Sequence, residues 1–147
     1  MVRLLIVDDD RNLRTLYEQE LTDEGYEVTA TGSGKDALRL ARELRPDLIV
    51  LDIAMPGMDG IEVLEKILSI DRAIPVVLNS AYSNYKDNFM TWSANAYVVK
   101  SGDLTELLQT IRRLLAARVE TQGAGGQDQH SPAQGSEARH LYVESGA

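Results

Sequence analysis

Short runs of apolar residues recur along the first 119 residues of the chain. Each is three to five residues long, and together they cover residues 4–7, 26–30, 48–51, 76–78 and 96–99. Most of these runs are apolar at successive positions, which is typical of strands buried on both faces of a parallel sheet. The run at 26–30 alternates more strongly between apolar and polar residues. The pattern predicts five short strands.

Amphipathic segments separate these runs, with apolar residues at every third or fourth position. They predict helices. Three of these have a capping residue at the start, Ser33, Asp59 or Asp103, and two end before Gly25 or Pro46. The predicted helices cover 11–24, the segment from Ser33 to before Pro46, a segment from Asp59 onward, 84–93 as the weakest, and a segment from Asp103 onward. Strands that alternate with helices of this size form a doubly wound parallel α/β fold. Such folds bind ligands outside the carboxyl ends of their strands.

The composition of the chain changes at Glu120. The last 28 residues contain five of the eleven glycines, several Gln, Ser and Ala residues, and both histidines, His130 and His140. A segment with so few apolar residues does not bury enough surface to offset the entropy of ordering. We therefore predict one domain over residues 1–119 and a disordered tail over 120–147.

The overall composition excludes several kinds of site. The chain has no cysteine, so disulfides, thiolate nucleophiles and cysteine-bound metals are excluded. Its net charge of -8 argues against a general nucleic-acid-binding surface, which needs positive charge. The first apolar run is four residues long, whereas a secretory signal needs about 7–15 apolar residues and a membrane span about 20. We expect a cytoplasmic protein whose chemistry depends on carboxylates, hydroxyls and lysine.

Polar residues follow the predicted strands. In strand order they are Asp8, Asp9 and Asp10, then Asp52, then Asn79 and Ser80, and then Lys100. Aspartates at the start of a helix also suit an N-cap with solvated acids, so residues 8–10 alone do not separate a structural from a functional role. Asp52 favours a functional role, because it follows a buried apolar strand and faces the other aspartates across the sheet edge.

These side chains together suit phosphoryl chemistry. Clustered carboxylates repel one another unless a cation lies among them, and oxygen ligands of this kind suit Mg²⁺, which also binds phosphate oxygens. Lys100 adds an ammonium group that can hold a phosphate, and Ser80 adds a hydroxyl. We interpret the set as a site in which Asp52 is the nucleophile and forms an aspartyl phosphate.

Four stretches of the sequence closely resemble the receiver domain of two-component response regulators. They are residues 4–10 (LLIVDDD), 47–60 (DLIVLDIAMPGMDG), 79–81 (NSA) and 96–100 (AYVVK), and the resemblance extends over residues 1–119. It implies a flavodoxin-like (βα)5 fold with strand order 2-1-3-4-5. It also implies a phosphoprotein of a signalling relay that takes part in its own phosphorylation and dephosphorylation without being an enzyme.

The resemblance implies a role for each matching residue. Asp52 would accept the phosphoryl group from a sensor histidine kinase or a histidine phosphotransfer protein. Mg²⁺ would be held by Asp8, Asp9, Asp52 and the backbone carbonyl of Ala54.

The same resemblance assigns the remaining side chains. Ser80 and Lys100 would bind the phosphoryl group. The rotamer of Tyr97 would follow Ser80, and this switch would remodel the face made by the fourth helix, fifth strand and fifth helix.

Two features depart from the receiver pattern. Ser101 follows Lys100 where receivers usually have proline after a cis peptide. Either this bond is trans and Lys100 is aimed differently, or it is a cis bond that costs about 2.5–4 kcal/mol. The positions two residues after Asp52 and Ser80 hold a small Ala54 and a bulky Tyr82, which leaves the lifetime of the aspartyl phosphate open.

Residues 32–35, Gly-Ser-Gly-Lys, look like part of a phosphate-binding loop. The full pattern needs glycine at 29 and serine or threonine at 36, where the chain has Thr29 and Asp36. We interpret this segment as the cap of a helix.

The sequence therefore predicts a single-domain receiver that signals through protein contacts, without binding nucleic acid directly or a membrane. We expect a monomer or a dimer that forms on phosphorylation. One alternative is an atypical receiver that binds its partners without phosphorylation. Another is a phosphatase of the haloacid dehalogenase type, but that class needs a second aspartate at the position of Ala54.

Overall fold

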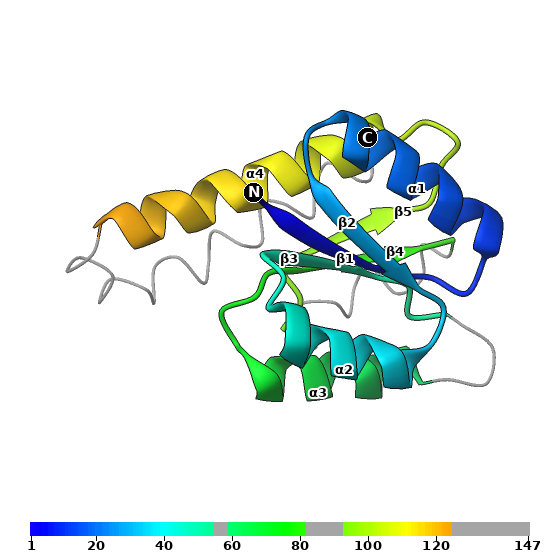
Figure 1. The fold of residues 1–147 in the computed structure, drawn as a ribbon, viewed down its shortest axis with the longest axis horizontal. Coiled ribbons are helices and arrows are strands. Elements are labelled where there is room, and N and C mark those ends of the chain that lie inside the picture. Colours follow the sequence, from blue (N-terminus) through cyan, green and yellow to red (C-terminus); the bar gives the residue numbers. More distant parts are fainter. Residues whose placement is uncertain (55–58, 82–92, 125–147) are drawn as a thin grey trace.

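Five parallel strands form the centre of the fold. The computed structural model describes residues 1–54, 59–81 and 93–124. The strands are β1 (Arg3–Val7), β2 (Glu27–Thr31), β3 (Leu48–Leu51), β4 (Val76–Ser80) and β5 (Ala96–Val99). They are hydrogen-bonded in the order β2-β1-β3-β4-β5, and Figure 1 shows them at the centre of the fold. The predicted flavodoxin-like sheet and its strand order are confirmed.

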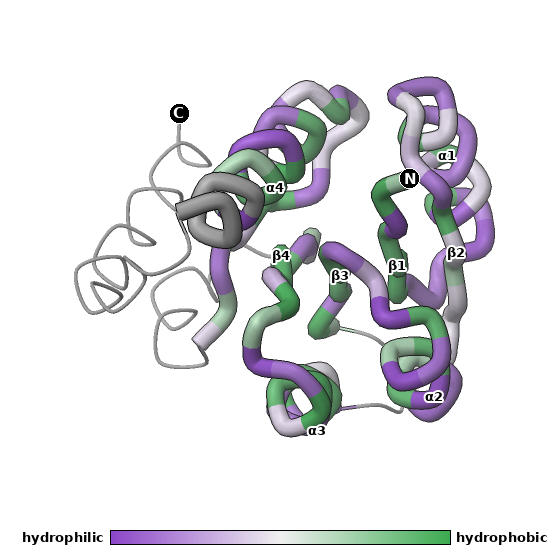
Figure 2. Tube along the Cα trace, turned by 60° about the vertical axis from the view of Figure 1, so that its left-hand side comes forward, coloured by the Kyte–Doolittle hydropathy of each residue, from purple (hydrophilic) through white to green (hydrophobic). Residues whose placement is uncertain are grey.

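Helices cover both faces of this sheet. They are α1 (Arg11–Asp23), α2 (Gly34–Leu44), α3 (Gly60–Ile70) and α4 (Thr105–Ala124). α1 and α4 lie on one face, and α2 and α3 lie on the other (Figure 2). Each face has its own cluster of buried apolar side chains. β1, β3 and β4 are apolar along most of their length because both of their faces are covered.

The predicted helix starts at Ser33 and Asp59 are confirmed. The Ser33 side chain accepts a hydrogen bond from the backbone N–H of Asp36 at the start of α2. Asp59 accepts from the N–H groups of Ile61 and Glu62 at the start of α3. Such bonds satisfy amide groups that have no partner within the helix. The Gly-Ser-Gly-Lys segment is therefore a helix cap.

The structure differs from the predicted boundaries at two elements. β4 continues through Ser80, because Asn79 and Ser80 pair with Val98 and Val99 of β5, so these polar residues end the strand instead of following it. α4 continues to Ala124, past the predicted end of the domain at residue 119.

The remaining boundaries stay predictions. The rest of the predicted tail, 125–147, and residues 84–92 of the weakest predicted helix lie outside the described residues. None of the helices in the part of the chain that the structure describes combines the length and the apolar character needed to cross a bilayer.

Candidate functional site

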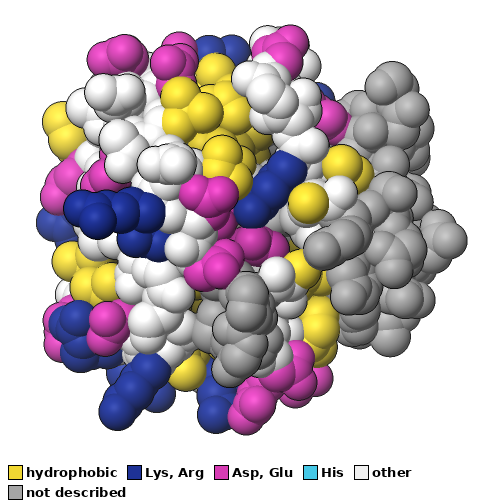
Figure 3. Space-filling model, turned by 90° about the vertical axis from the view of Figure 1, so that its right-hand side faces the viewer, with side chains coloured by type: hydrophobic (Ala, Val, Ile, Leu, Met, Phe, Trp, Pro, Cys, Tyr) yellow, Lys and Arg dark blue, Asp and Glu magenta, His cyan; other side chains and the backbone are white. Residues whose placement is uncertain are grey.

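The carboxyl ends of β1, β3 and β5 bring three charged residues together. Asp8 directly follows β1, Asp52 directly follows β3 and Lys100 directly follows β5. The backbone pairing of the strands continues to all three residues. Asp8 N–H donates to Thr31 O at 3.0 Å, Asp52 N–H to Val7 O at 2.9 Å and Lys100 N–H to Ser80 O at 2.7 Å. Figure 3 views this end of the molecule, where acidic side chains gather near the centre and basic side chains lie on either side. The predicted placement at the strand ends is confirmed for these three residues.

The Lys100 side chain lies between the two buried carboxylates. Its Nζ is 2.7 Å from Asp8 Oδ2 and 2.9 Å from Asp52 Oδ2. Asp8 and Asp52 are 1% and 4% exposed, so little water competes for these contacts. The peptide between Lys100 and Ser101 is trans. The expectation that a trans bond would aim Lys100 elsewhere is therefore wrong, because the ammonium group reaches both aspartates.

The pKa values of Asp8 and Lys100 reflect their burial and their mutual attraction. Burial raises the pKa of Asp8 above its usual value, and the contact with Lys100 only partly opposes that rise. Burial alone would lower the pKa of Lys100. Its contacts with Asp8 and Asp52 outweigh that effect and raise the pKa. Lys100 is therefore a charged ammonium at neutral pH.

Three carboxylates at this edge could hold a cation. Asp8, Asp9 and Asp52 each offer an oxygen, and these oxygens lie within 4.8 Å of one another. Asp8 Oδ2 is buried and touches Lys100 in an ion pair without hydrogen-bond geometry. An all-oxygen set with a buried oxygen that lacks a hydrogen bond fits a hard divalent cation such as Mg²⁺. Asp52 Oδ1 accepts from Ala54 N–H at 2.9 Å, which fixes the orientation of the Asp52 carboxylate.

Ser80 and Tyr97 lie close behind this site. Ser80 is the last residue of β4 and is fully buried. Tyr97 pairs with Leu78 across β4 and β5, and its side chain is packed in the core on the face of α2 and α3. The inward position is one of the two that the resemblance implies for Tyr97. Tyr82 lies outside the described residues.

The sequence analysis missed a buried polar pair beside the site. Asn79 Nδ2 donates a hydrogen bond to Tyr17 Oη at 3.0 Å, between β4 and α1. Both side chains are almost fully buried, and burial raises the pKa of the Tyr17 hydroxyl. The sequence feature that could have indicated this pair is Asn79 itself, because an asparagine buried in a largely apolar strand needs a hydrogen-bond partner. Tyr17 looked like one more apolar position of α1.

The five-stranded parallel fold agrees with that of solved response regulators. Residues 4–112 match the family model of the response regulator receiver domain. The chain belongs to this family.

Its relatives include curated transcriptional regulatory proteins and response regulators of known structure. The chain is 40% identical over 121 residues to the transcriptional regulatory protein PrrA of Mycobacterium tuberculosis, covering 81% of this chain and 52% of PrrA. It is 43% identical over 102 residues to the transcriptional regulatory protein AfsQ1 of Streptomyces coelicolor, covering 68% of this chain and 45% of AfsQ1. The chain thus spans about half the length of these curated relatives.

Among solved structures, the response regulator TrrA of Thermotoga maritima, in complex with Mg²⁺ and BeF, is 39% identical with a TM-score of 0.73. The match covers 78% of this chain and 99% of that one. TrrA has also been solved in complex with the histidine kinase ThkA, with 40% identity to this chain, a TM-score of 0.72, and coverage of 78% and 99%.

Proposed function

We propose that this chain accepts a phosphoryl group on Asp52 from a phosphohistidine of a sensor kinase or a histidine phosphotransfer protein. The observation that carries the proposal is the position of Lys100 Nζ, within 2.9 Å of both the Asp8 and Asp52 carboxylates at the ends of the strands. The named complexes of TrrA with Mg²⁺ and BeF and with the kinase ThkA support it, because TrrA is a relative at about 40% identity.

The chemical step needs a carboxylate oxygen that can attack phosphorus, and positive charge to neutralise the phosphoryl oxygens. An Asp52 oxygen attacks the phosphorus, a P–O bond forms, and the bond from phosphorus to the donor imidazole nitrogen breaks. That nitrogen keeps the electron pair of the broken bond. Ala54 N–H holds Oδ1 of Asp52, and Lys100 lies where it can pair with the oxygens of the arriving phosphoryl group.

Asp8, Asp9 and Asp52, with the backbone carbonyl of Ala54, would hold Mg²⁺. When bound, the ion supplies positive charge to the phosphoryl oxygens. Because Asp8 and Asp52 are buried against a single ammonium, the site carries more negative than positive charge before the ion binds. That surplus favours a divalent cation.

The output of this site is also part of the proposal. Ser80 would bind the phosphoryl group, and the rotamer of Tyr97 would report its presence to the face that includes β5 and α4. A downstream protein would recognise this face, with the receiver as a monomer or a phosphorylation-dependent dimer in the cytoplasm.

The test compares phosphorylation of three proteins by acetyl phosphate. The wild-type chain should be labelled in the presence of Mg²⁺ and lose the label when EDTA removes the ion. Asp52→Asn should not be labelled. Asp36→Asn makes the same chemical change at an exposed position on α2 and should behave as wild type.

Two results would count against the proposal. Equal labelling of Asp52→Asn would show that another residue is the acceptor. No labelling of the wild-type protein, together with no response to beryllofluoride, would favour a receiver that acts without phosphorylation.

A further inference from the structure

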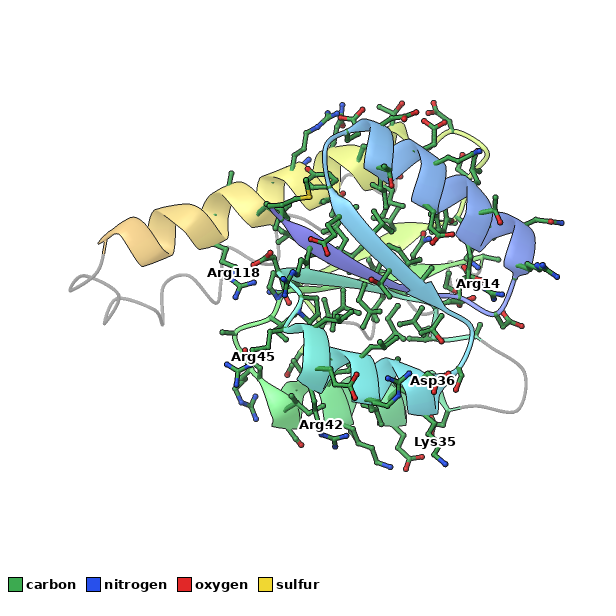
Figure 4. All side chains as sticks on the ribbon, in the orientation of Figure 1. Arg14, Lys35, Asp36, Arg42, Arg45 and Arg118 are labelled. Carbon is green, nitrogen blue, oxygen red and sulfur yellow. The ribbon has the colours of Figure 1, made fainter. Side chains whose placement is uncertain are left out.

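Arg14 of α1 contacts the backbone at the edge of the acidic site. Its Nη1 donates a hydrogen bond to the carbonyl oxygen of Asp8 at 2.8 Å. In Figure 4, Arg14 lies at the end of the sheet toward which β1 and β2 point, whereas Arg118 lies near the opposite end. The side chain is half-buried and belongs to neither the metal ligands nor the phosphoryl-binding residues proposed above.

The guanidinium group of Arg14 occupies space that exists because residue 32 is glycine. A Cβ atom at Gly32 would lie 2.6 Å from Arg14 Nη1, 3.3 Å from Arg14 Cζ and 3.5 Å from Asp8 O. The φ angle of Gly32 is outside the left-handed region, so its backbone does not require glycine. The requirement at this position is therefore for space beside Arg14.

The hydrogen bond from Arg14 completes the fixation of Asp8. The N–H of Asp8 donates to Thr31 O at 3.0 Å, and Oδ1 of Asp8 accepts from the N–H of Asp10 at 2.9 Å. Arg14 holds the Asp8 carbonyl, so the backbone N–H, the carbonyl and one carboxylate oxygen of Asp8 each have a hydrogen bond. The remaining polar atom of Asp8 is Oδ2, which faces Lys100 and the carboxylate cluster.

We propose that Arg14, whose guanidinium group lies beside Gly32, is a positioning residue that orients Asp8 and Asp9 for a divalent cation. This inference rests on the proposed function, because it takes the acidic cluster as the Mg²⁺ site. Arg14 acts through the backbone of Asp8 and does not touch the ion. Its positive charge alone would oppose a divalent cation nearby. If the contact is lost while the positive charge is kept, geometry predicts weaker Mg²⁺ binding and charge alone predicts no weakening, and this difference makes the proposal testable.

The experiment measures the dissociation constant of Mg²⁺ by calorimetric titration of the unphosphorylated full chain. Gly32→Ala keeps the positive charge of Arg14 and displaces its guanidinium group. Arg14→Lys keeps a positive charge at residue 14 but removes the planar guanidinium group. Each should weaken Mg²⁺ binding on the order of tenfold, as loss of a group that orients a metal ligand typically does. Arg11→Lys, on an exposed residue of the same helix, should bind as wild type.

The double variant separates positioning from general damage. If both residues act through one contact, Arg14→Lys with Gly32→Ala should bind Mg²⁺ no more weakly than either single variant. Thermal unfolding without Mg²⁺ should shift little in any variant, because both residues lie at the surface of the site. Beryllofluoride binding at saturating Mg²⁺ should be retained.

Different results contradict the positioning role of Arg14 and the proposed function. Unchanged or tighter Mg²⁺ binding in both single variants would overturn the positioning role of Arg14. In that case the proposed function would still stand, provided that the wild-type chain binds Mg²⁺. Additive losses in the double variant would also overturn it. Absence of Mg²⁺ binding by the wild-type chain would contradict the proposed function itself, and the inference would fail with it.

Discussion

Replacing Tyr17 by phenylalanine removes one hydroxyl from the interior of the fold. That hydroxyl, on α1, accepts a 3.0 Å hydrogen bond from Nδ2 of Asn79, near the end of β4. Asn79 is 2% exposed and Tyr17 is 1% exposed, so water cannot replace the lost partner without rearrangement. The Nδ2 group of Asn79 would lose this hydrogen bond while remaining buried.

The size of the effect follows from that desolvated amide. A buried polar group without a partner costs about 1–3 kcal/mol, so Tyr17→Phe should lower the free energy of unfolding by that amount. In a domain of this size each kcal/mol lowers Tm by about 3–5 °C. Asn79→Leu should be destabilising too, because the Tyr17 hydroxyl then loses its partner. Removing both polar groups at once replaces them with apolar surface and should cost much less than the sum of the two single losses.

Urea unfolding of the wild type, the two single variants and the double variant forms a complete double-mutant cycle. The control is Tyr26→Phe, which removes a hydroxyl from a half-buried tyrosine and should cost less than about 0.5 kcal/mol. A double variant whose loss equals the sum of the single losses would show that the two polar groups are not coupled, contrary to this prediction. Equal losses for Tyr17→Phe and Tyr26→Phe would also contradict it.

Three further changes test the site and its support. Asp8→Asn should stabilise the metal-free protein at neutral pH, because burial raises the pKa of Asp8 and ionisation is therefore costly in the fold. Between the unperturbed value of 3.8 and the raised pKa, the folded wild type binds more protons than the unfolded chain, so its stability falls as pH rises through this window. Urea unfolding at pH 3 and pH 7 should show the gain only at pH 7, and an equal gain at both would contradict the assignment. Lys100→Met should slow phosphorylation by acetyl phosphate about a hundredfold, whereas an unchanged rate would mean that the ammonium group is not used. Gly60→Ala would place a Cβ atom against the backbone of Ile53 and should cost at least about 2 kcal/mol in thermal unfolding, while Gly102→Ala meets no atom within 4 Å and should not.

The sheet and the position of the acidic site were predictable because each depends on a local pattern. Runs of successive apolar residues mark strands covered on both faces, and parallel strands of adjacent βα units end at the same edge. Asp8 and Asp52 therefore had to lie near each other once β1 and β3 were neighbours. The helix caps at Ser33 and Asp59 were equally local, since each involves residues two or three positions apart.

The contacts that support the site were not predictable in this way. The bond between Asn79 and Tyr17 joins residues 62 positions apart, and neither one reveals the other in the sequence. The space beside Gly32 depends on the path of Arg14 from another element. β4 reaches Ser80 because β5 offers backbone partners there, which outweighs the polar character of Asn79 and Ser80. Each of these features is set by the tertiary arrangement.

The most direct test of the account is to locate the phosphoryl group. The full chain is phosphorylated with acetyl phosphate and Mg²⁺, digested under conditions that preserve acyl phosphates, and analysed by mass spectrometry. We expect one phosphoryl group, labile to hydroxylamine, on the peptide that contains Asp52, and none when EDTA is present. A phosphoryl group on Asp8, Asp9 or a hydroxyl residue, or one that forms equally without Mg²⁺, would contradict this expectation.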